Sequence, residues 1–236
     1  MRRKTNAALL LVLAFALIAG ACSGGTSGEY DLIEADKLIV CSDIPYAPFE
    51  FEEGGAYSGF DVELMGAIGD ELGLAVEFID SGFDSITSGT AMVGNECDIA
   101  ASAITIRPDR EENIDFSDGY FDADQSLMVK KDSGYTSYDD LVGLRLGVQA
   151  GTTGEAYAND NNPGGVEIVS FGESADLFVA MEGGVIQGIL QVLTVIAERM
   201  LGDVSLTGVA TYPTGEVYVF AVMDEGKEAL LEAVIE

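Results

Sequence analysis

The chain contains no histidine and no tryptophan, and only 11 of its 236 residues are lysine or arginine, against 41 aspartates and glutamates. Without histidine a Ser-His-Asp triad cannot form, and three cysteines are too few for the common zinc sites. A formal net charge of -30 would repel nucleic-acid phosphates. We therefore expect no metal, no cofactor and no nucleic-acid partner, and we interpret the acidity as a solubility feature.

The remaining composition is that of a folded protein. Hydrophobic residues make up 48% of the chain and charged residues 22%, which is too apolar for a disordered acidic polymer. The length suits one large or two small domains.

The first 22 residues have the pattern of an export signal. Basic residues at positions 2–4 precede an uncharged run over 7–21, and small residues lead to Cys22 in "IAGAC". The alternative is a spanning anchor, but that requires about 20 apolar residues. We predict a lipoprotein signal peptide over 1–22, lipidation at Cys22, a tether over 23–36, and an exported protein held at a membrane in the periplasm or at the cell surface.

The two other cysteines, Cys41 and Cys97, lie beside apparent strands. Outside the cytoplasm such a pair can oxidise to a disulfide, whereas free buried cysteines behave as small hydrophobic residues. The residues alone leave both alternatives open.

Short β-type runs alternate with helical ones along the chain. "KLIVCS", "AVEFID" and "CDIAASA" read as strands, and between the first two lies a helix whose apolar stripe is formed by Phe60, Leu64, Ile68 and Leu72. A second alternation follows "QSLMVKK". This order predicts an α/β fold with two units built on mainly parallel sheets.

The last segment reads as a helix that stops early. Leu230, Leu231, Val234 and Ile235 form an apolar stripe that reaches Glu236 with no glycine cap. We expect the C-terminal helix to be truncated.

Several long motifs resemble one protein family. They are "SDIPYAPFEFEEGGAYSGFDVELMGAIGDELGLAVEF", "FDSITSGTAMVGNECDIAASAITIRPDREENIDFSDGYF", "DLVGLRLGVQAGTTGEAYA" and "VYVFAVMDEG". In this order and spacing they resemble the extracellular solute-binding proteins of ABC transporters for polar amino acids, from about Leu38 to the end of the chain.

The resemblance implies a periplasmic-binding-protein-like type II fold, in which two α/β domains joined by a two-segment hinge enclose a ligand cleft. It divides the chain into a first part of domain 1 over 37–121, domain 2 over 122–215, and a return to domain 1 over 216–236. The hinge segments would lie near 120–124 and 214–218.

The resemblance also implies an anchor for a ligand's α-carboxylate. It assigns the grip to Arg110, with the hydroxyl of Thr105 beside it, and a planar guanidinium is suited to a bidentate bond with a carboxylate. Arg107 departs from the family pattern, and we expect a solvated residue paired with the acidic side chains around it.

Other ligand contacts follow from the same register. Tyr46 and Phe83 would flank the aliphatic part of the ligand, although an aromatic residue near a proline is more often ordinary packing. Asp43 would read the side chain or the ammonium. The remaining predicted contacts are a carbonyl of Ala103, the polar groups of Gln149 and Thr152, and backbone amides near Thr153.

Val192 is the main departure from the family pattern. The family usually has at this position an aspartate that binds the α-ammonium, and an isopropyl group cannot replace it. We expect Val192 to weaken the binding of ordinary α-amino acids, with Asp43 or Gln191 restoring part of the loss.

The leading functional hypothesis is a monomeric receptor that closes over a small amino acid or carboxylate and delivers it to an ABC permease in the membrane. An enzyme similar to cyclohexadienyl dehydratase is the alternative, because it has the same architecture, and turnover of prephenate or arogenate would separate the two. The ligand-sensing domain of a signalling receptor is the third hypothesis.

Overall fold

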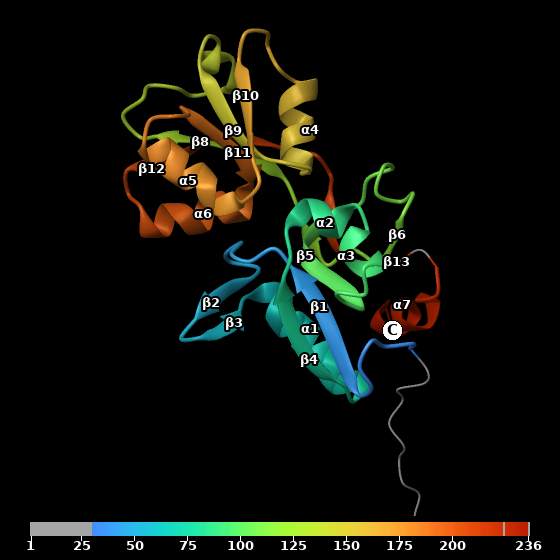
Figure 1. Cartoon of the computed structure of the whole chain (residues 1–236). Helices are drawn as coiled ribbons and strands as arrows, with labels where there is room; N and C mark the ends of the chain where they lie inside the picture. Colours follow the sequence, from blue (N-terminus) through green and yellow to red (C-terminus); the bar gives the residue numbers. More distant parts are fainter. Residues whose placement is uncertain (1–29, 224, 236) are drawn as a thin grey trace, which may run out of the picture.

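The computed structural model describes residues 30–223 and 225–235. The predicted export signal, Cys22 and the predicted tether up to residue 29 lie outside the described residues. Figure 1 shows two units, each a sheet with helices packed on it, joined by a narrow connection. Within the described ranges, no helix has the length and apolarity needed to cross a bilayer.

The first unit contains a six-stranded sheet in the order β4-β1-β5-β13-β6, with β7 also paired to β13. Strands β4, β1 and β5 are parallel, and β13 runs antiparallel to β5 and β6. Its strands are β1 (Lys37–Ser42), β4 (Ala75–Asp80), β5 (Ile99–Thr105), β6 (Ile114–Phe116), β7 (Phe121–Asp122) and β13 (Val217–Met223). Helices α1 (Phe60–Leu72), α2 (Phe83–Thr87), α3 (Thr90–Val93) and α7 (Glu228–Ile235) and a small hairpin of β2 (Phe51–Glu53) and β3 (Ala56–Ser58) complete it.

The second unit contains a five-stranded sheet in the order β10-β9-β11-β8-β12. Strands β10, β9 and β11 are parallel, and β8 is antiparallel to both of its neighbours. Its elements are β8 (Gln125–Lys130), η1 (Tyr138–Leu141), β9 (Arg145–Gln149), α4 (Thr153–Asp160), β10 (Glu167–Phe171), α5 (Ser174–Glu182), β11 (Gly188–Val192), α6 (Leu193–Gly202) and β12 (Leu206–Tyr212).

Two chain segments connect the units, one after β7 and one before β13. They lie side by side, because the amide of Ala123 donates to the carbonyl of Glu216 at 2.9 Å and the amide of Thr214 donates to Asp124 Oδ1 at 3.1 Å. A pair of adjacent strand-like segments permits rotation of one unit against the other with few contacts to break.

Helix α1 packs on the first unit through most of its predicted apolar stripe, because Leu64, Ile68 and Leu72 are partly buried against one core cluster. The buried positions are Asp61, Met65 and Gly69, whereas Phe60 is 43% exposed. Gly69 is needed there because a Cβ at this position would lie 2.2 Å from a methyl group of Val76. The most deeply buried line of the helix therefore lies one residue beyond the stripe, and it carries the carboxylate of Asp61 into the core.

Other elements also differ from the sequence-based expectations. In the second alternation, the segment "SYDDLVG" forms only the short 3-10 helix η1, and the sequence analysis did not anticipate the hairpin β2-β3 or strand β12. Helix α7 packs on the first unit, with Leu230 buried and both Leu231 and Val234 against the same core cluster.

Cys41 and Cys97 are joined by a disulfide. Both residues are buried in the cluster that β1 and β5 form with α2 and α3. The bond ties the segment before β5 to β1, across a sequence separation of 56 residues.

We predict that replacing both cysteines by alanine lowers the free energy of unfolding by roughly 2–4 kcal/mol, because the bond restricts the unfolded chain. Urea denaturation measures the change. Dithiothreitol should lower the midpoint of the wild type and leave that of the double variant in place. Equal midpoints for the wild type with and without reductant would contradict the prediction.

Candidate functional site

A cavity lies between the two units where the parallel strands of both sheets end. Strands β1 and β5 of the first unit and β9 and β11 of the second all lead into it. Ligand sites of open α/β sheets lie at this edge. The lining residues are Asp43, Tyr46, Phe83, Ser102, Ala103, Thr105, Gln125, Gln149, Thr152, Thr153, Gly154, Leu190, Gln191, Val192 and Tyr218.

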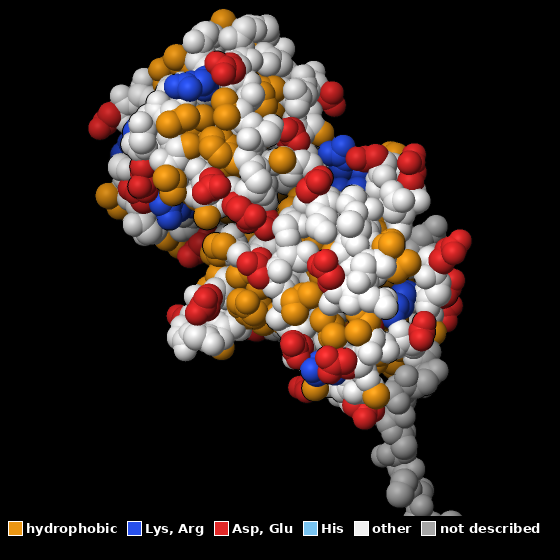
Figure 2. Space-filling model, viewed as in Figure 1, with side chains coloured by type: hydrophobic (Ala, Val, Ile, Leu, Met, Phe, Trp, Pro, Cys, Tyr) orange, Lys and Arg blue, Asp and Glu red, His pale blue; other side chains and the backbone are white. Residues whose placement is uncertain are grey.

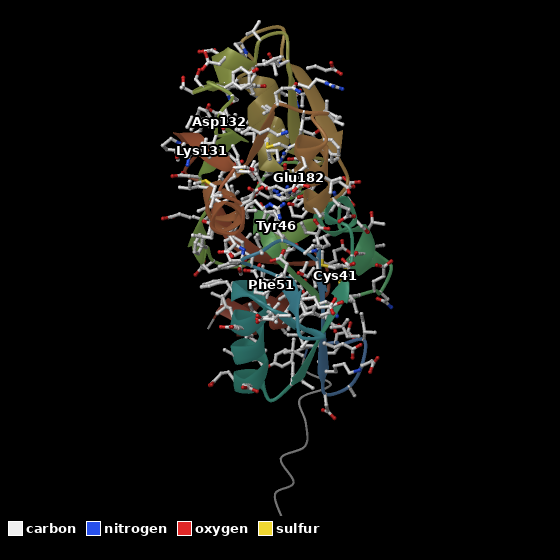
Figure 3. All side chains as sticks on the ribbon, turned by 90° about the vertical axis from the view of Figure 1, so that its left-hand side faces the viewer. Cys41, Tyr46, Phe51, Lys131, Asp132 and Glu182 are labelled. Atoms are coloured by element: carbon white, nitrogen blue, oxygen red, sulfur yellow. A yellow bond between two sulfur atoms is a disulfide. The ribbon has the colours of Figure 1, made fainter. Side chains whose placement is uncertain are left out.

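All the residues predicted to contact a ligand line this cavity, with the exception of Arg110. Figure 3 shows Tyr46 at the level where the two units meet, and Cys41 deeper in the first unit. Sequence reasoning did not anticipate five other lining residues, which are Ser102, Gln125, Gly154, Leu190 and Tyr218.

Arg110 lies beside the cavity and binds protein oxygens. It is 3% exposed, and its Nη1 donates to the carbonyl of Thr105 at 2.6 Å and to Thr105 Oγ1 at 3.0 Å. Nη2 donates across the units to the carbonyl of Gly151 at 2.8 Å, and the guanidinium carbon lies 5.3 Å from the centre of the Phe83 ring. Burial and the nearby Arg107 lower the pKa of Arg110 to about 10, so the group stays charged at neutral pH.

Arg107 combines the expected surface pairing with a contact that was not expected. Its Nε and Nη2 donate to the two carboxylate oxygens of Asp109 at 2.9 and 3.1 Å. In addition, Nη1 donates to the carbonyl of Thr152 in the second unit at 3.2 Å. Arg107 therefore helps to join the units and is not simply solvated.

Asp43 makes the third polar contact between the units. Gln149 Nε2 donates to Asp43 Oδ2 at 2.6 Å, and the amide of Asp43 is held by Ser102 Oγ at 2.9 Å. Burial raises the pKa of Asp43 from its ordinary value to about 7, against the lowering effect of the Gln149 bond, and the nearby carboxyl of Glu173 raises it further. At neutral pH this carboxyl is thus only partly ionised.

The cavity itself is small in this arrangement. Its volume is about 30 Å³, while one water molecule needs about 10–15 Å³ on the same measure. An amino acid can therefore enter only if the units move apart and the bonds made by Arg107, Arg110 and Gln149 break.

Two buried carboxyl groups lie directly behind the cavity wall. Asp61 Oδ2 accepts the amide of Ala103 at 2.8 Å and the hydroxyl of Tyr120 at 2.7 Å. Glu50 Oε1 accepts the hydroxyl of Ser102 at 2.8 Å. Each group also has a second carboxylate oxygen that is buried without a hydrogen-bond partner among the described residues.

The Asp61 bond holds an unusual backbone conformation. Ala103 has φ +46°, a left-handed value that costs a non-glycine residue about 1 kcal/mol or more. The amide that Asp61 accepts belongs to this residue, and the carbonyl of the same residue is the predicted ligand contact. Asp61 therefore positions the cavity wall without lining the cavity.

Burial makes both groups harder to ionise. The pKa of Asp61 rises from its usual value to about 6, chiefly by burial, although the Ala103 and Tyr120 bonds lower it. The pKa of Glu50 lies well above its ordinary value because the group is buried and Asp61 is close by.

Val192 lies at the N-cap position of α6, where its side chain makes no capping hydrogen bond, and it is 5% exposed at the cavity wall. On the other side, Thr152 caps α4, where its Oγ1 accepts the amide of Glu155 at 3.1 Å, and Glu155 Oε2 accepts the amide of Gly151 at 2.8 Å. These two bonds already occupy the backbone amides of Glu155 and Gly151 at the start of α4.

The surface around the site is acidic. Figure 2 shows acidic side chains spread over both units on this face and few basic ones. Within residues 30–223 and 225–235, no group of three or more cysteine, aspartate or glutamate side chains is arranged to hold a metal ion.

We predict that Glu50→Gln stabilises the protein most at alkaline pH. A raised folded-state pKa means that the folded protein binds more protons than the unfolded chain, so stability falls as the pH rises from about 4 through the folded pKa. Glutamine imitates the protonated form and removes one such group. Thermal unfolding of both proteins at several pH values between about 5 and 8 measures the effect. The variant should lose less stability over this range, and an unchanged pH dependence would contradict the prediction.

Comparison with known proteins agrees with this architecture. The arginine-binding extracellular protein of Bacillus subtilis is 36% identical over 155 residues, which cover 66% of this chain and 60% of that relative. This chain thus spans three fifths of the relative's length. Among solved structures, the arginine-bound arginine-binding protein of T. maritima has a TM-score of 0.78 and 30% identity, covering 84% of this chain and 93% of that one.

A further solved structure is that of an ancestral amino acid-binding protein described as a precursor of cyclohexadienyl dehydratase. It has a TM-score of 0.76 and 33% identity, and the match covers 84% of this chain and 86% of the other. The family model of the bacterial extracellular solute-binding proteins, family 3, matches residues 38–236, and the chain belongs to this family.

Proposed function

We propose that this protein is the substrate-binding receptor of an ABC importer and captures a polar amino acid or a related small carboxylate by closure of its two units. The proposal rests on the cavity between the units. Residues of both units line this cavity, and hydrogen bonds between the units surround it. A site built in this way changes when the units move, so ligand binding and domain motion are coupled.

The relatives support an amino acid as the ligand. The Bacillus subtilis relative is named as an arginine-binding protein, and the T. maritima structure contains arginine. The predicted ligand residues other than Arg110 line one cavity, and the aromatic rings of Tyr46 and Phe83 are available there for the aliphatic part of such a ligand.

In this proposal Arg110 binds the ligand carboxylate after exchanging a partner. In the closed arrangement its Nη2 donates to the carbonyl of Gly151. A carboxylate is a stronger acceptor than a carbonyl for a guanidinium, and it can accept two parallel bonds. Thr105, which binds Arg110 and lines the cavity, would then contribute its hydroxyl.

The cellular setting is part of the proposal. We infer a monomer that is exported, lipid-anchored through Cys22 and in contact with an ABC permease. The family is described as extracellular, which supports export.

One observation keeps an enzymatic alternative open to test. Asp43 is a buried carboxyl in the cavity with a pKa near 7, as a general acid requires, and one structural neighbour is described as a precursor of cyclohexadienyl dehydratase. Assays for turnover of prephenate and arogenate by the purified protein therefore belong beside the binding measurements.

Titration calorimetry of the exported part of the chain against the twenty amino acids and their deaminated acids tests the proposal. The chain contains no tryptophan, so closure is better followed by small-angle X-ray scattering than by tryptophan fluorescence. We expect at least one amino acid to bind and to reduce the population of opened molecules. Binding of none of these compounds would contradict the proposed function.

We predict that Arg110→Ala lowers the affinity for a carboxylate ligand about a hundredfold or more, because a ligand carboxylate left unpaired in a closed site costs roughly 3 kcal/mol or more. Arg107→Ala is the matched control, since it removes a neighbouring arginine that also contacts the second unit. We expect less than a tenfold effect from this control. Equal losses in the two variants, with unfolding temperatures close to that of the wild type, would show that Arg110 does not bind the carboxylate.

A further inference from the structure

The cavity contains an excess of unused hydrogen-bond acceptors. Asp43 Oδ1, Gln125 Oε1 and Gln191 Oε1 are buried and have no hydrogen-bond partner among the described residues. All three side chains line this one cavity and are at most 5% exposed. Buried polar atoms are normally paired, so three such atoms around one cavity point to a ligand.

Both glutamine amides are oriented by their NH₂ groups. Gln125 Nε2 donates to Thr153 Oγ1 at 3.2 Å, and Gln191 Nε2 donates to Ser174 Oγ at 2.7 Å. Since the nitrogen of each amide is held in this way, its carbonyl oxygen is the group left for another partner. Gln149 differs from both, because its NH₂ group binds Asp43 Oδ2 and the carbonyl of Gly172.

Strand pairing places Gln125 beside the position where the family's aspartate is missing. Val192 on β11 lies opposite Gln125 on the antiparallel strand β8. Side chains of directly opposed residues lie on the same face of a sheet with Cβ atoms about 5 Å apart. The long side chain of Gln125 can therefore present an oxygen where Val192 presents methyl groups.

The unused groups match an ammonium group. An ammonium has three N–H donors and no acceptor, and the cavity offers three carbonyl or carboxylate oxygens. None of the described residues that line the cavity is a lysine or an arginine, so none of these lining side chains places a positive charge beside the three oxygens. A ligand carboxylate in the same place would meet only repulsion from Asp43.

We propose that the side-chain carbonyls of Gln125 and Gln191, together with Asp43, bind the α-ammonium group of an amino acid ligand, in place of a carboxylate at position 192. This assignment rests on the proposed function. It makes the protein a receptor for α-amino acids despite Val192, with two neutral amide oxygens and one carboxylate as the acceptors.

Substitution of Gln125 by glutamate tests the assignment. Glutamate keeps an acceptor oxygen and adds a charge, and it can accept a hydrogen bond from the Thr153 hydroxyl in place of the bond that Gln125 Nε2 now donates to this hydroxyl. A charge-assisted bond to an ammonium is stronger than a neutral one, so we expect roughly tenfold tighter binding of an amino acid. Gln191→Glu is the second variant and should act in the same direction.

Gln187→Glu is the matched control. It makes the same change of charge just before β11, at the end of the strand away from Val192, where Gln187 accepts the amide of Arg145 at 3.1 Å and does not line the cavity. This variant should bind like the wild type. Thermal unfolding of all the variants checks that each is folded.

Pairs of ligands with and without the ammonium give the readout. L-arginine is compared with 5-guanidinopentanoate, and L-glutamine with glutaramate, by calorimetry on the wild type and each variant. We expect Gln125→Glu to increase the preference for the amino acid over its deaminated partner about tenfold, and Gln187→Glu to leave it unchanged.

Two other results would contradict the assignment, and they differ in whether the proposed function fails as well. In the first, the wild type binds an amino acid, but neither Gln125→Glu nor Gln191→Glu increases the preference for the amino acid over its deaminated partner. This result would overturn the assignment and leave the proposed function standing. Absence of wild-type binding to any of the twenty amino acids would overturn the proposed function, and this assignment with it.

Discussion

The hydrogen bond from the amide of Ala103 to Asp61 is the constraint on which the cavity depends. It holds the end of β5 in a left-handed conformation that alanine rarely adopts. Ser102 on one side then reaches both Glu50 and the amide of Asp43, and Thr105 on the other side binds Arg110. The free energy of burying Asp61 and Glu50 is the cost of this arrangement, and it shows as raised pKa values for both groups.

Closure of the two units relies on polar contacts that a ligand must replace. Arg107 and Arg110 donate to backbone carbonyls of the second unit, and Gln149 donates to Asp43. A ligand shifts the population towards the closed state only by the difference between its affinities for the two states. A carboxylate on Arg110 meets this condition, because it binds the guanidinium more strongly than the Gly151 carbonyl does.

The sequence predicted the α/β alternation, which depends on local patterns. Through the collinear family motifs it also predicted ligand residues that, except for Arg110, line the cavity. It predicted three of the four apolar residues that α1 packs on the core, but not that Phe60 is exposed and Asp61 buried. Asp61 is buried because it accepts bonds from Ala103 and Tyr120, which are 42 and 59 residues away. Gln125 was missed for the same reason, because its position opposite Val192 follows from strand register and not from any motif. Non-local pairing is where sequence reasoning failed in this protein.

Amide oxygens have a physical advantage over a carboxylate at position 192. Burial already raises the pKa of Asp43 to about 7, and the carboxyl of Glu173 raises it further. While the cavity is empty, another carboxylate in it would repel Asp43 and favour protonation of one of the two, and only a bound ammonium would offset this repulsion. The carbonyls of Gln125 and Gln191 accept hydrogen bonds without adding charge, so Asp43 can ionise when a ligand ammonium arrives. The charge that Asp43 retains thus offsets part, but not all, of the weaker bond that each neutral oxygen makes.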